Sequence, residues 1–319
     1  MRSTNYIFNQ LVVAISSKIK GCFVLSITVL SNFYIDSEER FLRLQSSINS
    51  FCDADIAKWI INVRGPLAEK VKSFLSDRLG KKLYISRKES KAGWINDTLQ
   101  LAELIETEYV HYWVEDHICT VPPETLNEIY KSIYKSGIDI INYSFFGLGA
   151  HVKEFEGLRY QEIGFLRFLE YNHDANLKRQ KNSKKLYQGN GTFLVSLLSI
   201  MKTGYFKKLL SDKFPKLPNW PKYLPFNFEK SPKATHLLPF KIGFTTVELF
   251  APIDDDSHIS GSSLISRGLY PNRVSRKHML DLRNQLEIRN YIYLKSILKK
   301  NKLITVIYKI IRRIGYWLT

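Results

Sequence analysis

Apolar runs and amphipathic segments alternate along the first 117 residues, and this alternation is the strongest constraint on the fold. The apolar runs are short and rich in β-branched and aromatic residues, which is typical of buried strands. The segments between them carry apolar residues at helical spacing. The predicted strands are Phe23–Leu30, Trp59–Val63, Leu83–Ser86 and Tyr109–His117, and the predicted helices between them cover residues 37–51, 67–79 and 98–106.

Strands that alternate with helices pair in parallel through right-handed crossovers. A further predicted helix over 123–136 and a strand over Ile138–Tyr143 continue the same alternation. We therefore predict an α/β fold with a single doubly wound, mostly parallel sheet. Residues 1–22 precede the pattern and are interpreted as a lead-in.

The fourth predicted strand ends in three side chains that can bind a cation: Glu115, Asp116 and His117. Residues two apart on a strand point to the same face, so Glu115 and His117 are expected to project together. Ligands of open α/β sheets lie beyond the carboxyl ends of the strands. The cluster could therefore hold a divalent metal ion on a phosphate. The alternative interpretation is a surface turn, because Asp and Glu are common after strands.

The net charge of +17 is concentrated toward the C-terminus. Residues 267–319 hold thirteen Lys and Arg against two acidic residues, which leaves an excess of only +6 for the other residues. This distribution indicates one basic surface rather than a basic protein throughout, and no nucleic-acid partner is expected. The three cysteines are far apart and odd in number, which fits neither a zinc site nor a disulfide framework and suits a reducing compartment.

Residues 303–318 project as an amphipathic helix, with Lys and Arg opposite an apolar arc and with Tyr316 and Trp317 near its end. The pattern is typical of a helix that lies on an anionic membrane surface; the alternative is a helix that packs on the protein's own core. The apolar run Leu11–Ile15 is too short for a membrane span or a signal peptide. We therefore expect a cytoplasmic protein, peripheral at the inner face of the cell membrane.

Three stretches carry a resemblance to a known family. The first predicted strand and its polar turn read Ser26–Asn32, a helix motif follows Gly93 in Asn96–Ala102, and the strand Tyr109–His117 ends in the acidic cluster. In order and spacing they resemble the nucleotide-binding half of inverting glycosyltransferases of the A fold, family-2-like. The resemblance covers residues 23 to about 145 and implies a nucleotide-diphospho-sugar transferase fold.

The resemblance divides the chain into a nucleotide-sugar-binding half at 23–146, an acceptor-binding and catalytic half at 147–266, and a basic helical tail at 267–319. It implies an enzyme of hexosyltransferase type that moves a sugar, with inversion, from a nucleotide-diphosphate donor. The expected donor is a UDP-sugar, and the expected acceptor is a glycan or a lipid-linked molecule. Such an activity would serve bacterial surface polysaccharide synthesis.

Two positions depart from the family pattern. Glu115-Asp116-His117 stands where the family has D-x-D, although Glu and His are both competent manganese ligands. The second strand usually ends in an Asp that contacts the base, whereas here it reads Ile61-Asn62-Val63-Arg64. Asn62 could still hydrogen-bond a base edge.

The resemblance also implies roles for individual side chains. The metal ligands are expected to be Glu115 and His117, with His258 as a further one. Lys91 and Arg87 could add positive charge near the diphosphate, or they could be solvated surface residues. The nucleotide-sugar-binding residues are expected to be Leu30, Ser31, Asn32, Asn62, Lys91, Gly93, Asn96 and Asp116.

Inversion needs a base that takes the proton of the acceptor hydroxyl. Glu229 is the first candidate, because it lies about as far after the metal motif as the family's base and within an aromatic stretch, which would raise its pKa. Asp255 is the alternative, in the run Asp254-Asp255-Asp256. That run could instead cap a helix at an exposed turn.

Two later segments are predicted to be irregular. Residues 172–190 are polar and basic, and we interpret them as a loop that orders on ligand binding or as a solvated face. Residues 214–240 are rich in Pro and aromatic residues, which predicts an ordered loop over the sheet. Two other functions compete with the transferase: a nucleotidyltransferase on a similar sheet, and a non-enzymatic basic protein that binds membrane or nucleic acid.

Overall fold

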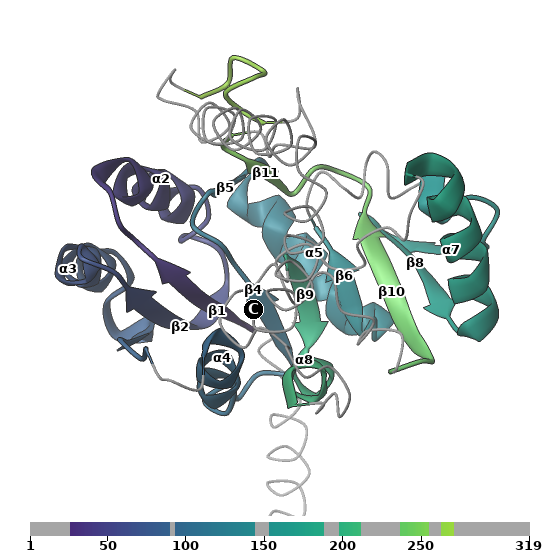
Figure 1. Cartoon of the computed structure of the whole chain (residues 1–319), viewed down its shortest axis with the longest axis horizontal. Helices are drawn as coiled ribbons and strands as arrows, with labels where there is room; N and C mark the ends of the chain where they lie inside the picture. Colours follow the sequence, from purple (N-terminus) through teal and green to yellow (C-terminus); the bar gives the residue numbers. More distant parts are fainter. Residues whose placement is uncertain are drawn as a thin grey trace, which may run out of the picture.

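A nine-stranded sheet in the order β3-β2-β1-β4-β9-β6-β10-β8-β7 forms the centre of the molecule (Figure 1). The computed structural model describes residues 26–89, 93–143, 153–187, 198–211, 237–254 and 263–270. The strands of the large sheet are β1 (Ile27–Tyr34), β2 (Ile56–Arg64), β3 (Leu83–Ser86), β4 (Tyr109–Tyr112), β6 (Ile140–Asn142), β7 (Gln161–Ile163), β8 (Leu166–Tyr171), β9 (Ser199–Lys202) and β10 (Phe240–Thr245). A second, two-stranded sheet pairs β5 (His117–Cys119) with β11 (Phe250–Pro252).

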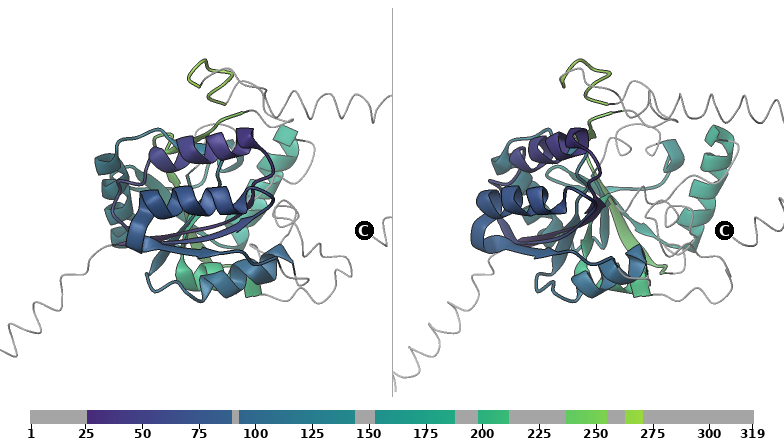
Figure 2. Two further views of the ribbon diagram at one scale, coloured as in Figure 1. Left: turned by 90° about the vertical axis from the view of Figure 1, so that its left-hand side faces the viewer. Right: turned by 60° about the vertical axis from the view of Figure 1, so that its left-hand side comes forward.

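The helices cover both faces of the large sheet (Figure 2). They are α2 (Glu38–Asn49), α3 (Ala68–Leu79), α4 (Trp94–Ala102), α5 (Pro123–Ser136), α7 (His173–Tyr187) and α8 (Thr203–Ser211), with a short 3-10 helix η1 (Gly80–Lys82) after α3. Helices α2, α3 and α5 pack on one face and contribute to the first hydrophobic core. Helices α4 and α8 pack on the other face and contribute to the second core.

The predicted doubly wound arrangement is confirmed. Strands β3, β2, β1 and β4 are parallel neighbours, and successive residues of a strand enter opposite cores, as Val29 and Leu30 of β1 do. The sheet is mostly but not wholly parallel, because β9 and β8 run against their neighbours. Strands from both predicted halves, 23–146 and 147–266, share this one sheet.

Local signals set the helix ends. Ser37 has extended backbone and its side chain accepts a hydrogen bond from the amide of Arg40, so it caps α2. Helix α5 begins at Pro123 and ends before Gly137, which adopts the left-handed conformation. Helix α4 begins at Trp94, four residues earlier than its predicted start.

Two predictions of secondary structure are wrong. The strand predicted over Tyr109–His117 ends at Tyr112, and His117 instead begins β5 in the second sheet. Glu115 and His117 therefore do not project from one strand. The predicted loop at 172–190 is largely helix α7, because Asn172 caps it through the amide of Ala175 and because Lys, Arg and Leu favour helices.

None of the helices in the described residues is long and apolar enough to cross a membrane. The lead-in at 1–22 and the amphipathic tail at 303–318 lie outside the described residues, so the prediction of a membrane-surface helix stays a prediction. Most of the Pro-rich stretch at 214–240 also lies outside them.

Candidate functional site at the switch point of the sheet

The connections of the sheet reverse direction between β1 and β4. From β1 the chain moves outward to β2 and β3, and it then returns to place β4 on the other side of β1. The segments that follow β1 and β4 consequently lie side by side at the carboxyl ends of the strands. In open α/β sheets such a switch point is where ligands bind.

Buried hydrogen bonds fix the end of β4 against β1. The Ser31 hydroxyl donates to the Trp113 carbonyl at 2.7 Å, and the Trp113 amide donates to the Leu30 carbonyl at 3.0 Å. Ser31 and Leu30, which the sequence assigned to the nucleotide sugar, are both fully buried. The structure therefore places both residues inside the sheet, where they support the site rather than line it.

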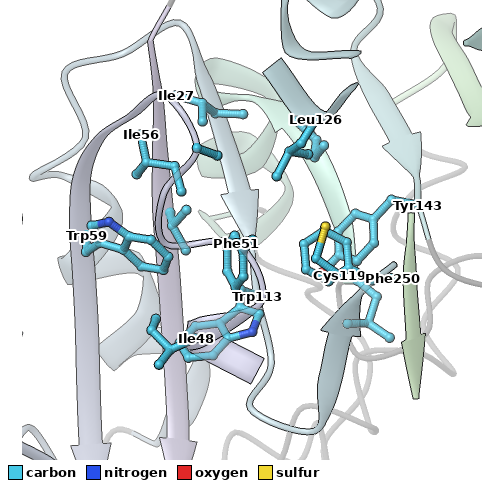
Figure 3. Packing of buried hydrophobic residues seen from close by; sticks show 14 of the residues in the cluster. Ile27, Ile48, Phe51, Ile56, Trp59, Trp113, Cys119, Leu126, Tyr143 and Phe250 are labelled. Carbon is cyan, nitrogen blue, oxygen red and sulfur yellow. The ribbon is translucent and has the colours of Figure 1, made fainter. Parts of the chain in front are cut away.

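The Trp113 side chain anchors the segment that carries the acidic cluster. It packs edge-on against Phe51 and Trp59, with ring centroids 5.7 and 6.0 Å away (Figure 3). Its indole N–H donates to the Ser47 hydroxyl of α2 at 2.8 Å, and that hydroxyl donates to the His117 carbonyl. Residues on both sides of Glu115 and Asp116 are thus held by the first core.

Arg40 of α2 lies among three carboxylates at the switch point. Its guanidinium makes an ion pair with Glu115 and lies 4.0 Å from the Asp36 carboxylate. Burial by itself lowers the pKa of the Arg40 guanidinium, but the charges of Glu115, Asp116 and Asp36 raise it above its ordinary value. Arg40 therefore links the segment after β4 to the start of α2.

Asp116 and His117 form a carboxylate–imidazole pair beside this cluster. His117 Nδ1 lies 2.8 Å from Asp116 Oδ1, and His117 Nε2 is buried with no hydrogen-bond partner in the part of the chain that the structure describes. A carboxylate at Nδ1 leaves the lone pair on Nε2, which is the common arrangement of a metal-binding histidine. His117 therefore fits a divalent cation, whereas Glu115 is turned toward Arg40.

The full ligand set expected from the sequence is not assembled within the described residues. Over those ranges no three His, Cys, Asp or Glu side chains are grouped so that they could hold a metal ion. Four further candidates, Lys91, Glu229, Asp255 and His258, lie outside the described residues.

The second acidic run begins beside the first. The Ile253 amide donates to the Asp116 carbonyl at 2.9 Å, and Pro252 pairs with His117 across the small sheet. Asp254 is buried, and its carboxylate accepts from the Arg43 guanidinium at 2.6 Å. Two clusters that are far apart in the sequence are therefore joined at this end of the sheet.

A network of side-chain amides links β1 and β2 to the segment after β3. Asn62 donates to the Asn32 side chain at 2.9 Å and to the Lys88 carbonyl at 2.7 Å, and it accepts from the Lys88 amide at 2.7 Å. Asn32 in turn donates to the Thr98 hydroxyl at 2.9 Å. Both asparagine amides are buried and bonded to protein, so they position the walls of the site.

An open pocket of about 270 Å³ lies at the carboxyl ends of β1, β2 and β3. Tyr34 and Arg64 end their strands there, and Arg87 and Glu89 come from the segment that Asn62 holds. The Arg64 guanidinium lies 6.0 Å from the centroid of the Tyr34 ring. An aromatic ring and cations beside the carboxyl ends of parallel strands suit a flat, anionic ligand such as a nucleotide.

Two other predicted residues lie at the start of α4. Gly93 has a φ of 87° and immediately precedes the helix, while Asn96 is exposed in its first turn. Sequence reasoning missed several residues that the structure places at the site. They are Tyr34, Arg40, Arg43 and Glu89. In the sequence, Tyr34 and Glu89 are marked only by their position at or just after the end of a strand, and Arg40 and Arg43 only by their position on the buried side of a helix whose first turn is acidic.

The fold and the site together describe a doubly wound α/β domain with a charged cluster at its switch point and an open pocket at the carboxyl ends of β1, β2 and β3. Neither a family model nor a curated protein matches the sequence. Among solved structures, the chain is similar to residues 1–349 of S. aureus TarS, with 16% identity, a TM-score of 0.43, and coverage of 70% of this chain and 59% of that one. The same TarS segment was solved with UDP and with UDP-GlcNAc, each at a TM-score of 0.42. The chain spans about three fifths of that TarS segment.

Proposed function

We propose that this chain is a glycosyltransferase that takes its sugar from a nucleoside-diphosphate donor. The observation that carries the proposal is the pocket lined by Tyr34, Arg64 and Glu89 at the carboxyl ends of β1, β2 and β3, at the same end of the sheet as the charged cluster after β4. A nucleotide sugar has a flat base at one end and a diphosphate in its middle, so it needs two such neighbouring sites. The family resemblance of residues 23–145 favours the same class and a UDP-sugar as donor.

In this proposal the base lies against Tyr34, and the diphosphate extends toward Asp116 and His117. The carboxylates of Asp36, Glu115 and Asp116 lie around Arg40, so a diphosphate that approaches them meets negative charge as well as the guanidinium. A manganese or magnesium ion held by His117 Nε2 and by His258, with Asp116 orienting the His117 imidazole, would neutralise the leaving diphosphate. Arg40 would hold the Glu115 carboxylate in its ion pair while no donor is bound.

Transfer with inversion needs one base on the acceptor side of the sugar. Glu229 and Asp255 both remain candidates for this base. We favour Glu229 on its distance from the metal motif, while Asp255 follows the anchored Asp254 directly. The acceptor is proposed to be a glycan or a lipid-linked molecule, which the tail at 303–318 would approach by lying on an anionic membrane.

A turnover assay with a panel of nucleotide sugars tests this function. We expect one donor to be hydrolysed or transferred in the presence of manganese. His117→Ala and Asp116→Ala are each expected to lower that rate by about 100-fold, because they remove a metal ligand and the group that orients it. Glu124→Gln, an exposed change in the first turn of α5, is the control and should retain the wild-type rate.

The two candidate bases separate in the same assay. Loss of transfer with unchanged donor binding identifies the base, and Glu229→Gln and Asp255→Asn are the variants to compare. Donor turnover by His117→Ala at the wild-type rate would contradict the proposed diphosphate site.

A further inference from the structure

We infer that Arg40 is an internal cation that competes with a divalent ion for the Glu115 carboxylate when no donor is bound. The inference rests on the proposed function, because it concerns the ion that the donor site is proposed to hold. Arg40 is thereby a positioning residue, which keeps Glu115 from the ion until the diphosphate of a donor enters. The observations that carry the inference are the partners of Arg40, the ring nitrogens of His117 and the anchoring of α2.

Glu115 is a buried carboxylate that already holds a cation. Its side chain is 6% exposed and makes an ion pair with the Arg40 guanidinium. A buried carboxylate is strongly destabilising without a positive partner, and either a guanidinium or a divalent ion can be that partner. Two cations that approach one carboxylate repel each other, so occupation of Glu115 by Arg40 weakens the binding of the ion.

His117 gives a second and independent indication that a cation binds at this place. The residue is 7% exposed, and its Nε2 is buried with no hydrogen-bond partner among the residues that the structure describes. Asp116 Oδ1 lies 2.8 Å from the other ring nitrogen, Nδ1, and the charge of Asp116 also acts on the Arg40 guanidinium. Arg40 and the imidazole thus share one carboxylate as a neighbour, so the guanidinium opposes a divalent ion that binds to His117.

Helix α2 cannot withdraw from this cluster, because one face of the helix is fixed there. Arg40, Arg43 and Ser47 are spaced by three and four residues and therefore lie on the same face of α2. Arg43 makes a buried ion pair with Asp254 at 2.6 Å, and the Ser47 hydroxyl donates to the His117 carbonyl. A change of partner for Arg40 is therefore a movement of its side chain and not of the helix.

The Arg40 side chain has a second carboxylate close by. Asp36 lies four residues earlier, and its carboxylate is 4.0 Å from the guanidinium. The Arg40 side chain is also 32% exposed, so it has room to turn away from Glu115. A diphosphate offers it further charge-assisted hydrogen bonds, which leaves Glu115 to the ion. Donor and ion are therefore expected to bind cooperatively.

Titration of the full chain with Mn²⁺ alone, followed by the electron paramagnetic resonance signal of the free ion, tests the inference. We expect Arg40→Gln to bind Mn²⁺ about tenfold more tightly than wild type, because the buried Glu115 carboxylate is then left for the ion. Damage to the site would weaken binding, so the sign of the change separates competition from a purely structural role. Arg40→Lys keeps the positive charge and should keep an affinity close to that of wild type.

The gain in affinity should also depend on Glu115. Adding Arg40→Gln to a Glu115→Gln variant is expected to change Mn²⁺ affinity by less than about twofold, because the contested carboxylate is gone. Lys70→Gln is the matched control. It removes another cation that pairs with α2, in the exposed ion pair with Glu38, and should keep the wild-type affinity.

Equal or weaker Mn²⁺ binding by Arg40→Gln would overturn the inference. A gain of the same size in the Glu115→Gln background would overturn it as well, because Glu115 would then not be the contested group. The titration contains no nucleotide, so these results leave the proposed function intact. Failure of every nucleoside diphosphate to bind, measured separately, would instead refute the proposed function.

Discussion

Replacing Arg43 by methionine is expected to lower the free energy of unfolding by about 3–5 kcal/mol. Arg43 and Asp254 are both about 5% exposed at the side chain and lie 2.6 Å apart, so the substitution leaves a carboxylate in a buried place without its guanidinium. Burial by itself lowers the pKa of Arg43, but Asp254 and Glu39 together raise it above its ordinary value. Urea unfolding curves measure the loss.

Two further variants separate this effect from lost packing. Lys70→Met breaks the exposed ion pair with Glu38 and should change stability by no more than about 1 kcal/mol. The double variant Arg43→Met/Asp254→Leu removes both buried charges and should recover much of the loss. A double variant as unstable as Arg43→Met would show that the ion pair does not account for the effect.

Acidification below pH 6.5 is expected to destabilise the protein through His111. This imidazole is fully buried on β4, and burial lowers its pKa from 6.5 to about 3. The unfolded chain therefore takes up a proton near pH 6.5 that the folded chain refuses until about pH 3. The contribution of His111 to the free energy of unfolding is therefore fully present above pH 6.5. Below that pH it falls by about 1.4 kcal/mol per pH unit, which amounts to about 2.7 kcal/mol at pH 4.5.

The measurement is the free energy of unfolding between pH 7.5 and 4.5 for wild type and His111→Phe. The variant loses the hydrogen bond between His111 Nδ1 and the Tyr130 hydroxyl, so its stability at pH 7 drops, but its slope below pH 6.5 should be shallower. His173→Phe, a change at an exposed position of α7, should keep the wild-type slope. Parallel slopes for wild type and His111→Phe would refute the assignment.

The first half of the fold could be predicted because its signals are local. Strand β3 and helix α5 have the predicted bounds, and β1, β2, α2 and α3 differ from theirs by a few residues. The prediction failed where tertiary contacts decide. Nothing local marks the end of β4 at Tyr112, because the two residues that follow are apolar and Trp113 is buried against Phe51 and α2. Strands β7, β8 and β10 were not predicted, since their pairing is with distant segments.

The location of the candidate site could be predicted from the sequence, but the contacts of its individual residues could be predicted less well. The switch point follows from the order of elements, and Asp116 and His117 lie there as expected. The pairing of Glu115 with Arg40 could not be foreseen, because Arg40 is 75 residues earlier in the chain. Asn32 and Asn62 were expected to face the nucleotide, yet their amides bond to each other. Polar residues at strand ends can thus support a site rather than line it.

The most direct test of the account is calorimetry of the full chain with UDP, GDP, CDP and TDP, each with and without manganese, on wild type and His117→Ala. We expect one diphosphate to bind with a dissociation constant on the order of micromolar, to require manganese, and to lose most of its affinity in the variant. Absence of binding by every nucleotide, with manganese and without it, would contradict a nucleotide-sugar site at the switch point between β1 and β4.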